Sequence, residues 1–334
     1  MKVLLYFEGE KYISKSGIGR AMKHQIAALT SQGIDYTLDP KDNYDIAHIN
    51  TIGIQSNRLI NYCRKRNIKI IYHAHSTEED FRNSFILSNQ ISPIFKKRII
   101  SLYSQADCIV TPTSYSRQVL LSYNKINKPI YVVSNGIDIN EFNYDMEKVN
   151  LFRKYFNISK NQKTIICVGL FFKRKGIIDF FEVAKKMPEY LFIWFGDTPL
   201  YLIPHDIRKL IKNPPENVVL PGYIKGDILK GAYAGADAFF FPSYEETEGI
   251  VVLEALASHQ QCVIRDIPVY ESWLKDGENC LKGNKNEDFI RIIKQVVERP
   301  ELSLKNRARE TAEKFAIENV GVELKNIYEK VIEK

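Results

Sequence analysis

The sequence lacks the features that mark several classes of protein. No apolar run approaches the ~18–20 residues that span a bilayer as a helix. The apolar stretch at the N-terminus ends at Glu8, which is too short for the core of a signal peptide. The five cysteines are odd in number and none are spaced as C-x-x-C, which favours buried, reduced thiols over disulfides or a metal site. These absences predict a chain that stays in the cytosol.

Motifs typical of two other functions are missing as well. Met22 stands where a G-x-G-x-x-G fingerprint needs its third glycine, and no acidic residue ends a second strand in the pattern that binds NAD. A dinucleotide-dependent dehydrogenase is therefore disfavoured. The formal net charge of +7 comes without a zinc pattern or an aromatic-basic strand motif, so nucleic acid is not an expected partner.

The positive charge is concentrated in one region. Residues 58–100 contain nine basic and three acidic residues, a net charge of +6, which suggests an anionic partner. Basic and apolar side chains mix in residues 81–100, as in a surface helix on anionic lipid, although the apolar ones would equally suit the domain core. The membrane-binding candidates are Phe85, Phe95, Lys96, Lys97 and Arg98.

Short apolar runs alternate with helix-length amphipathic segments along all 334 residues, the pattern of parallel βα units. We expect strands near 3–7, 46–49, 68–73, 108–110, 131–133, 165–168, 191–195, 218–220, 238–241 and 262–264. The fold class is therefore α/β, with two Rossmann-like, doubly wound parallel sheets that face each other across a cleft. We expect an N-terminal domain over 1–145, a C-terminal domain over 146–316, and a last helix at 317–334 that packs back on the first domain.

An acidic loop after the expected strand at 238–241 is the strongest local signal. Pro242 ends that strand, Gly249 opens a helix, and Glu246 and Glu254 are eight residues apart. Amides at a helix N-terminus suit phosphate oxygens or sugar hydroxyls, and two carboxylates accept hydrogen bonds from diols. The alternative is that acidic residues here only favour the helix N-terminus.

A basic turn follows another expected strand. Lys173, Arg174 and Lys175 precede Gly176, and such cations suit a diphosphate, with arginine giving paired contacts and lysine a point charge. A solvated basic turn would look the same.

Two weaker signals lie in the first half. Gly17 and Gly19 follow the first strand, and a flexible turn explains them equally well. His73 and His75 end a strand with their side chains on one face. They are either structural or functional, and no further metal ligands are evident beside them.

The acidic loop resembles the E-x7-E signature of retaining glycosyltransferases of family 4, which have the GT-B fold, and the similarity runs through the whole chain. The resemblance implies that Glu246 lies by the donor sugar and that Glu254 holds the ribose. It assigns His75, in preference to His73, to the donor sugar, and Arg174 and Lys175 to the diphosphate. The other donor-binding residues that it implies are Gly17, Gly19, Tyr223, Ile224, Thr247, Glu248, Gly249 and Ile250.

One position departs from the family pattern, because Leu170 stands where the family has an arginine that contacts phosphate. D-x-D, which holds diphosphate through a metal in glycosyltransferases of the other major fold, is absent. We therefore expect no cofactor and no metal, with Arg174, Lys175 and helix dipoles neutralising the leaving group.

Four segments together resemble bacterial glycolipid synthases that add a second hexose to monoglucosyl-diacylglycerol: 15–20, 45–50, 75–81 and 245–249. This implies a UDP-glucose or UDP-galactose donor, a lipid acceptor, and a peripheral place on the cytoplasmic face of the membrane. The alternatives are a GT-B enzyme of capsule or wall polysaccharide synthesis and a nucleotide-sugar 2-epimerase. Donor hexose, linkage and oligomeric state are not readable from the sequence.

Overall fold

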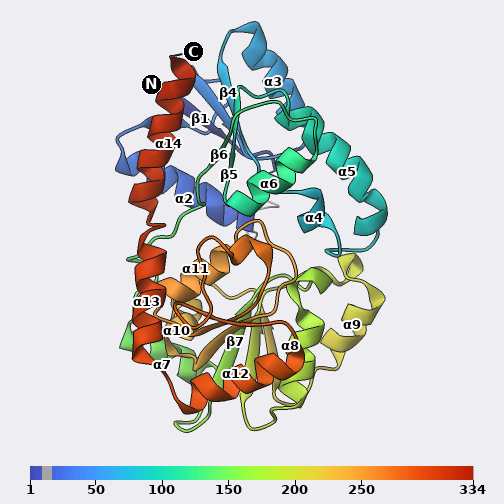
Figure 1. Ribbon diagram of the computed structural model, residues 1–334, viewed down its shortest axis with the longest axis vertical. Helices are drawn as coiled ribbons and strands as arrows, with labels where there is room; N and C mark the ends of the chain where they lie inside the picture. The colour runs from blue at the N-terminus through green and yellow to red at the C-terminus, as the bar shows by residue number, and fades with distance from the viewer. Residues whose placement is uncertain (10–16, 334) are drawn as a thin grey trace. The chain divides into compact units, whose positions relative to one another are not determined.

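The computed structural model describes residues 1–9 and 17–333, and it divides the chain into two compact units (Figure 1). The N-terminal domain comprises Met1–Phe81, Asn89–Ile137 and Phe315–Lys334, and the C-terminal domain comprises Arg82–Ser88 and Asp138–Lys314. The division after Ile137 differs from the expected one at 145. The short segment Arg82–Ser88 also belongs to the C-terminal domain, although it lies within the first half of the sequence.

The described part of the N-terminal domain contains one parallel six-stranded sheet in the order β2-β1-β3-β4-β5-β6. Its strands are β1 (Lys2–Tyr6), β2 (Asp35–Thr37), β3 (Ile46–Ile49), β4 (Lys69–His73), β5 (Cys108–Thr111) and β6 (Ile130–Val132). Its helices are α2 (Gly17–Ser31), α3 (Ile54–Lys65), α4 (Glu78–Phe81), α5 (Ser88–Tyr103), α6 (Ser114–Ser122) and α14 (Ile317–Ile332).

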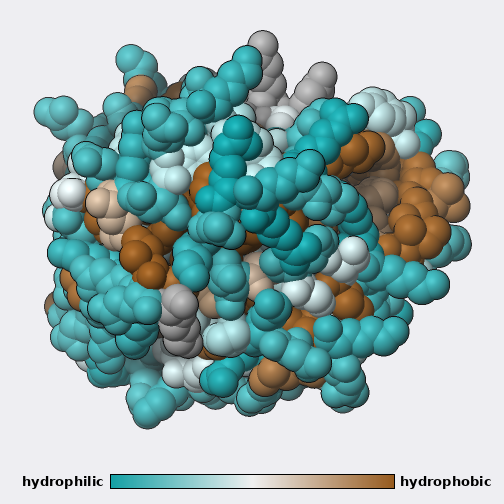
Figure 2. Space-filling model, turned by 90° about the horizontal axis from the view of Figure 1, so that it is seen from above, coloured by the Kyte–Doolittle hydropathy of each residue, from teal (hydrophilic) through white to brown (hydrophobic). Residues whose placement is uncertain are grey.

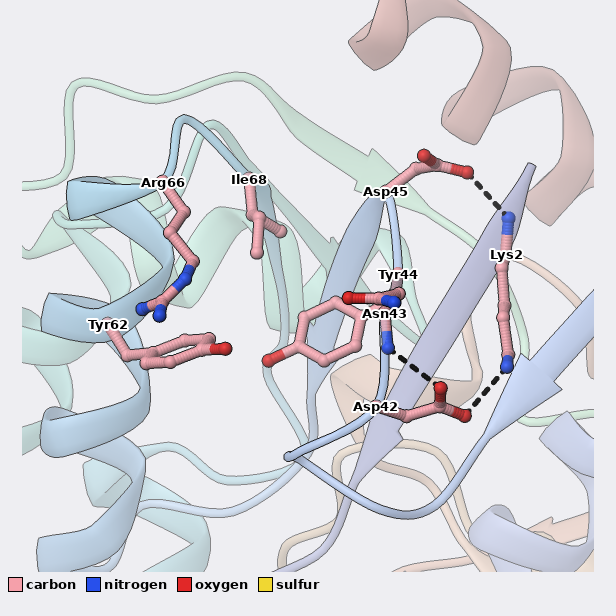
Figure 3. A pocket seen from close by; sticks show the side chains of 8 residues that line it. All are labelled: Lys2, Asp42, Asn43, Tyr44, Asp45, Tyr62, Arg66 and Ile68. Atoms are coloured by element: carbon pink, nitrogen blue, oxygen red, sulfur yellow. Dashed lines mark hydrogen bonds and ion pairs between the residues drawn. The ribbon is translucent and has the colours of Figure 1, made fainter.

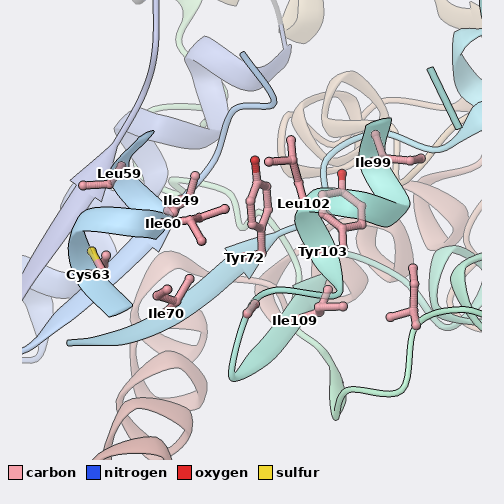
Figure 4. Close-up of a cluster of buried hydrophobic side chains, with 14 of the residues drawn as sticks. Ile49, Leu59, Ile60, Cys63, Ile70, Tyr72, Ile99, Leu102, Tyr103 and Ile109 are labelled. Carbon is pink, nitrogen blue, oxygen red and sulfur yellow. The ribbon is translucent and has the colours of Figure 1, made fainter. Parts of the chain in front are cut away.

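The central strands of this sheet are buried on both faces, because successive side chains point to opposite sides. On β1, Leu4 enters a cluster with side chains of α3 and α5, which Figure 4 shows around Tyr72 and Tyr103. Val3 and Leu5 enter the opposite cluster, which α2 and α14 complete. The last helix of the chain therefore closes one face of the first sheet.

The described part of the C-terminal domain contains a second parallel six-stranded sheet, in the order β12-β11-β10-β7-β8-β9. Its strands are β7 (Thr164–Val168), β8 (Leu191–Phe195), β9 (Val218–Gly222), β10 (Ala238–Phe241), β11 (Cys262–Arg265) and β12 (Leu281–Gly283). Its helices are α7 (Met146–Tyr155), α8 (Ile177–Lys185), α9 (His205–Lys212), α10 (Asp227–Gly235), α11 (Ile250–Ala257), α12 (Asn286–Glu298) and α13 (Leu302–Glu313).

Strands β7 and β10 are neighbours in this sheet although they are far apart in sequence. The chain builds outward from β7 to β9 on one side, then crosses over and builds outward from β10 to β12 on the other. In open α/β sheets, ligands bind beside the carboxyl ends of the strands where the order reverses. The loops after β7 and β10 are therefore the expected ligand-binding loops of this domain.

The elements that sequence reasoning missed or misplaced are informative. The edge strands β2 and β12 have three residues each and no apolar run that would reveal them. Helix α7 begins at Met146, inside the polar stretch at 140–150, and α5 begins at Ser88 with Pro93 inside it. All five cysteines, which lie in the described residues, are buried and form no disulfide.

Candidate active site

The basic turn and the acidic loop meet at the switch point of the second sheet. The turn follows β7 and includes the short 3-10 helix Lys173–Lys175, and the loop follows β10 and ends at Gly249, where α11 begins. Gly176 makes the close approach possible. Its φ is 74°, and a Cβ there would lie 2.3 Å from the carbonyl oxygen of Pro242, so only glycine fits.

Glu246 is the centre of this arrangement. Its carboxylate is buried, and Oε1 accepts a hydrogen bond of 2.6 Å from the Ser243 hydroxyl. The same oxygen pairs with Nζ of Lys175, and Nη1 of Arg174 lies 3.9 Å from it. A buried carboxylate is tolerated when it is paired and hydrogen-bonded in this way.

The charge of Glu246 follows from these contacts. Burial alone raises the pKa of a carboxyl, but the positive charges of Lys175 and Arg174, with hydrogen bonds from Lys175 and Ser243, outweigh it. The pKa of Glu246 is therefore below its ordinary value, and the side chain is ionised at neutral pH. The site thus contains a buried anion between two cations.

Arg174 is also held by hydrogen bonds of its side chain and its backbone. Its Nε donates to the Ser84 hydroxyl at 2.8 Å, and its Nη1 donates to the carbonyl oxygen of Glu245 at 3.0 Å. Its backbone amide donates to the carbonyl oxygen of Asn83 at 3.0 Å. A solvated basic turn would not have these contacts, so that alternative is excluded for Arg174.

Glu254 lies one helical turn inside α11 and is fully buried. The Tyr233 hydroxyl, from α10, donates to its Oε2 at 2.7 Å. Sequence reasoning missed Tyr233, since nothing local to α10 signals this contact.

Gly249 allows the turn that leads into α11. Gly249 has a φ of 93°, and a Cβ there would lie 3.0 Å from the hydroxyl of Tyr270. That hydroxyl is buried and has no hydrogen-bond partner in the described residues. Thr247 and Glu248 precede Gly249 in the loop, and Ile250 is the first residue of α11. The remaining donor candidates, Tyr223 and Ile224, follow β9 at the same edge of the sheet.

Arg265 braces the acidic loop and was also missed. Its guanidinium lies 3.8 Å from the centre of the Tyr244 ring, donates to the carbonyl oxygen of Pro242 at 3.0 Å, and pairs with Asp179 at 3.0 Å. Tyr244 donates to the same Asp179 carboxylate at 3.0 Å. The position of Arg265 at the end of β11 could have revealed this residue, because parallel strands end at one edge of the sheet and Arg265 therefore lies near the acidic loop.

The histidines lie in the N-terminal domain. The rings of His73 and His75 stack with centres 4.0 Å apart, and Nε2 of His75 lies 2.8 Å from Oδ1 of Asn50. Both are buried, and burial lowers the pKa of His75 to about 3, so its imidazole is neutral at pH 7. Gly17 and Gly19 lie in the first turn of α2, not in a flexible turn, and residues 15–16 of the segment 15–20 lie outside the described residues.

The structure corrects the proposed membrane-binding residues. Lys96 pairs with the buried Glu78 at 3.0 Å, and Arg98 donates to the carbonyl oxygens of Ile52 and Gly53. These two cations are half-buried, and both are bonded within the domain. Phe95 stacks on Phe81 with ring centres 4.0 Å apart and packs against the core, and Phe85 is half-buried. Of the five candidates, only Lys97 is well exposed.

A cavity of ≈ 350 Å³ lies at the other edge of the first sheet (Figure 3). Figure 3 shows Arg66 over the Tyr62 ring and Lys2 bonded to Asp42 and Asp45. Lys2 begins β1, so this cavity is at the amino ends of the strands, whereas His75 follows the carboxyl end of β4. The cavity is therefore separate from the candidate site.

In residues 1–9 and 17–333, no helix is both long and apolar enough to cross a bilayer. In the same residues, no group of three or more histidine, cysteine, aspartate or glutamate side chains is placed to hold a metal ion.

Comparison with known proteins agrees with this geometry. Residues 149–315 match the family described as glycosyl transferases group 1, and residues 33–141 match glycosyltransferase family 4. The chain is 47% identical over 332 residues to the processive diacylglycerol alpha-glucosyltransferase of Acholeplasma laidlawii, covering 99% of each protein.

More distant proteins share the fold. The chain is 24% identical over 295 residues to an alpha-galactosylglucosyldiacylglycerol synthase of Streptococcus pneumoniae, covering 86% of this chain and 77% of that protein. The solved structure of Anabaena HepE with UDP and glucose has a TM-score of 0.82 at 15% identity, covering 99% of this chain and 100% of that one. The expected fold and family are confirmed, and the chain belongs to the group 1 glycosyltransferases of the GT-B fold.

Proposed function

We propose that this glycosyltransferase moves glucose or galactose from a UDP-sugar to monoglucosyl-diacylglycerol, giving a dihexosyl-diacylglycerol. The full-length similarity to a diacylglycerol alpha-glucosyltransferase supports the lipid acceptor and favours glucose as the hexose. The observation that carries the proposal is the buried, ionised Glu246 between Lys175 and Arg174 at the start of α11.

Each residue of the site has a task in this proposal. Lys175 and Arg174 stabilise the negative charge that develops on the departing UDP, and the α11 N-terminus adds its dipole. Glu246 contacts the donor sugar, and Glu254, oriented by Tyr233, binds the ribose. His75 contacts a hydroxyl of the donor sugar. No metal takes part, and the α configuration of the donor is retained.

The test is direct. The purified chain is incubated with UDP-glucose or UDP-galactose and a panel of acceptors: diacylglycerol, monoglucosyl-diacylglycerol and a polyprenyl-diphosphate sugar. Products are identified by mass spectrometry, and the new anomeric centre by NMR. An α-linked dihexosyl lipid, formed equally well in EDTA and absent with Glu246→Gln, is the expected result.

Other outcomes would support a different function. Transfer to the polyprenyl acceptor alone would indicate polysaccharide synthesis, and an epimerised UDP-sugar would indicate an epimerase. A β-linked product would contradict retention, and strict dependence on Mn²⁺ or Mg²⁺ would contradict the metal-free mechanism.

We also propose that the protein binds anionic membranes peripherally, at the cytoplasmic face, because its acceptor would stay in the bilayer. Exposed apolar side chains support two contact regions. One is in the C-terminal domain, where the amide of Ile86 donates to the carbonyl oxygen of Leu202 at 3.0 Å. This region, which we call the apolar tip, consists of Ile86, Leu87, Leu200, Tyr201 and Leu202.

The apolar tip has the chemistry of a membrane contact. Tyr201 is 74% exposed, and aromatic side chains with a polar end favour the membrane interface. Helix α9 follows directly and presents the exposed cations Lys209 and Lys212, each of which contributes about 1 kcal/mol near an anionic surface.

The second region is the solvent-exposed side of α5 in the N-terminal domain. Ile91, Ile94 and Lys97 are exposed there, with Ile94 at 68%. These residues replace Lys96, Arg98 and Phe95 as the membrane candidates of this helix. Figure 2 shows a mostly hydrophilic face on which apolar side chains gather in separate patches, the largest toward its right-hand edge.

A further inference from the structure

A buried polar cluster in the N-terminal domain connects His75 to the last helix of the chain. Tyr328 of α14 lies 2.7 Å from Nδ1 of His48, and Nε2 of His48 lies 3.2 Å from Nδ1 of His73. Nε2 of Gln25 lies 2.8 Å from Nδ1 of His73 and 2.8 Å from Oδ1 of Asn50. All of these side chains are buried, so their hydrogen positions depend on one another.

The two ends of the cluster determine the direction of its hydrogen bonds. Tyr328 has one hydroxyl hydrogen, and Nδ1 of His48 is its acceptor. Nδ2 of Asn50 lies 3.4 Å from the carbonyl oxygen of His48, which can only accept. Oδ1 of Asn50 therefore faces the opposite way, toward Gln25 and His75.

The rest follows atom by atom. Because Nδ1 of His48 accepts, its Nε2 carries the proton and donates to Nδ1 of His73. Nδ1 of His73 has one lone pair, which the N–H of His48 shares with the closer amide of Gln25, and Gln25 also donates to Oδ1 of Asn50. Nε2 of His75 must also donate to Oδ1 of Asn50. All three histidines are then the Nε2–H tautomer, and Nδ1 of His75 carries a lone pair.

The only other consistent arrangement reverses the donor and acceptor in every hydrogen bond. It is less favourable at both ends of the cluster. The hydroxyl hydrogen of Tyr328 would lose its acceptor, and an oxygen of Asn50 would face the carbonyl oxygen of His48. Either order leaves the same two positions unpaired, Nε2 of His73 and Oε1 of Gln25. An unpaired buried polar group costs about 1–3 kcal/mol, so the two ends decide the direction.

We propose that Tyr328, His48, Gln25 and Asn50 are positioning residues that hold His75 as the Nε2–H tautomer, so that its Nδ1 accepts a hydrogen bond from a sugar hydroxyl. Within the described residues Nδ1 of His75 has no partner, and it is not closed off from solvent as Nε2 of His73 is. The identity of the hydroxyl rests on the proposed function, whereas the tautomer does not. The last helix thus supports the site as well as the core.

The tautomers are measurable without activity. The full chain, labelled with ¹⁵N-histidine, is examined by long-range ¹H–¹⁵N NMR, in which protonated and unprotonated ring nitrogens are well separated. His48, His73 and His75 are assigned by single His→Gln variants. Each should show a protonated Nε2 and an unprotonated Nδ1 at pH 7. A protonated Nδ1 on His75 overturns the proposal, even if the enzyme transfers sugar as proposed.

Tyr328→Phe removes one hydroxyl and keeps the ring. We expect a mixture of tautomers at His48 and His75, and a kcat about tenfold lower, or about 1.4 kcal/mol, with KM for the UDP-sugar unchanged. Tyr103→Phe is the matched control, since its hydroxyl donates to the carbonyl oxygen of Ser76 in the other core cluster of the same domain. Equal kinetics and tautomers in both variants would contradict the positioning role.

Asn50→Asp tests the same idea through pH. A carboxylate still accepts from Nε2 of His75, but it raises the pKa of that imidazole and lets Nδ1 become protonated. The other titratable groups of the buried cluster are His73, His48 and Tyr328. As pH decreases, the activity of Asn50→Asp should decline at a clearly higher pH than the activity of the wild type. A profile equal to that of the wild type, with lower activity throughout, would indicate a structural role only.

Discussion

The two domains contain the same kind of parallel sheet, but the carboxyl edge carries buried charges in one domain and neutral polar groups in the other. In the C-terminal domain the edge contains a buried carboxylate between two cations, Glu246 with Lys175 and Arg174. In the N-terminal domain it contains neutral imidazoles joined by amides and a phenol, such as His75 and Asn50. Buried charges are suited to an anionic diphosphate, and neutral donors and acceptors are suited to hydroxyl groups.

The difference also sets how each site is stabilised. Buried charges are costly to separate from their partners, because one uncompensated ion remains behind. A neutral cluster costs less when a single bond is lost, but its members depend on each other for direction. The two sites should therefore respond differently to substitution, pH and loss of a partner.

Breaking the charged cluster should give the largest effect. Lys175→Met should lower transfer by about 10²–10³-fold and the free energy of unfolding by about 3–5 kcal/mol, since Glu246 stays buried without its partner. The double variant Lys175→Met with Glu246→Gln should recover much of the stability but none of the activity. Urea unfolding and kcat/KM measure the two quantities.

A control for this experiment lies at the amino edge of the same sheet. Asp237 pairs with Lys163 at 3.0 Å, away from the loops after β7 and β10. Asp237→Asn should leave kcat/KM nearly unchanged. If the double variant of Lys175 and Glu246 transferred sugar normally, the charged cluster would be structural only.

Acid should weaken the N-terminal domain first. The pKa values of His48 and His75 fall from 6.5 to about 3 because of burial, so between pH 6.5 and 5 they bind protons only in the unfolded state. Each should therefore cost about 2 kcal/mol of stability by pH 5. The lowered pKa of Glu246 acts later: its contribution is present above its ordinary 4.5 and is lost as pH falls through the lower folded value.

The two tryptophans make this testable, because Trp194 and Trp273 both belong to the C-terminal domain. Urea unfolding by circular dichroism and by tryptophan fluorescence should diverge at pH 5 more than at pH 7, with fluorescence changing later. One histidine of the C-terminal domain, His259, also has a pKa lowered by burial, but it is partly exposed and should contribute less. Coincident transitions at both pH values would contradict the domain difference.

Substitutions in one of the two membrane-contact regions should have the smallest effect. Replacing Leu200, Tyr201 and Leu202 by serine should reduce binding to phosphatidylglycerol vesicles by about tenfold. This corresponds to about 1.4 kcal/mol, less than the roughly 1.5–3 kcal/mol for one fully buried apolar side chain, because a shallow membrane contact buries each side chain only in part. Ile91→Ser with Ile94→Ser tests the α5 region in the same way. Vesicle flotation at low and high salt provides the measurement. If both variants float as well as the wild type, membrane binding uses another surface.

The sequence alone determined the loops that carry the charged site. The proximity of Glu246, Arg174 and Lys175 was predictable, because each lies in a loop that follows an apolar strand and parallel strands end at one edge of a sheet. Five of the six strands of each sheet were equally readable, since each contains a short apolar run. The edge strands β2 and β12 were not, because their three residues contain no apolar run.

Only the tertiary structure decided which side chains share a contact across long stretches of sequence. Tyr328 meets His48 from 280 residues away, and Ser84 meets Arg174 from 90 residues away. Lys96 and Arg98 look like surface cations in sequence, yet the fold turns them toward Glu78 and the carbonyl oxygen of Ile52. Local patterns report burial and element type, whereas the partner of a polar side chain depends on which elements pack together.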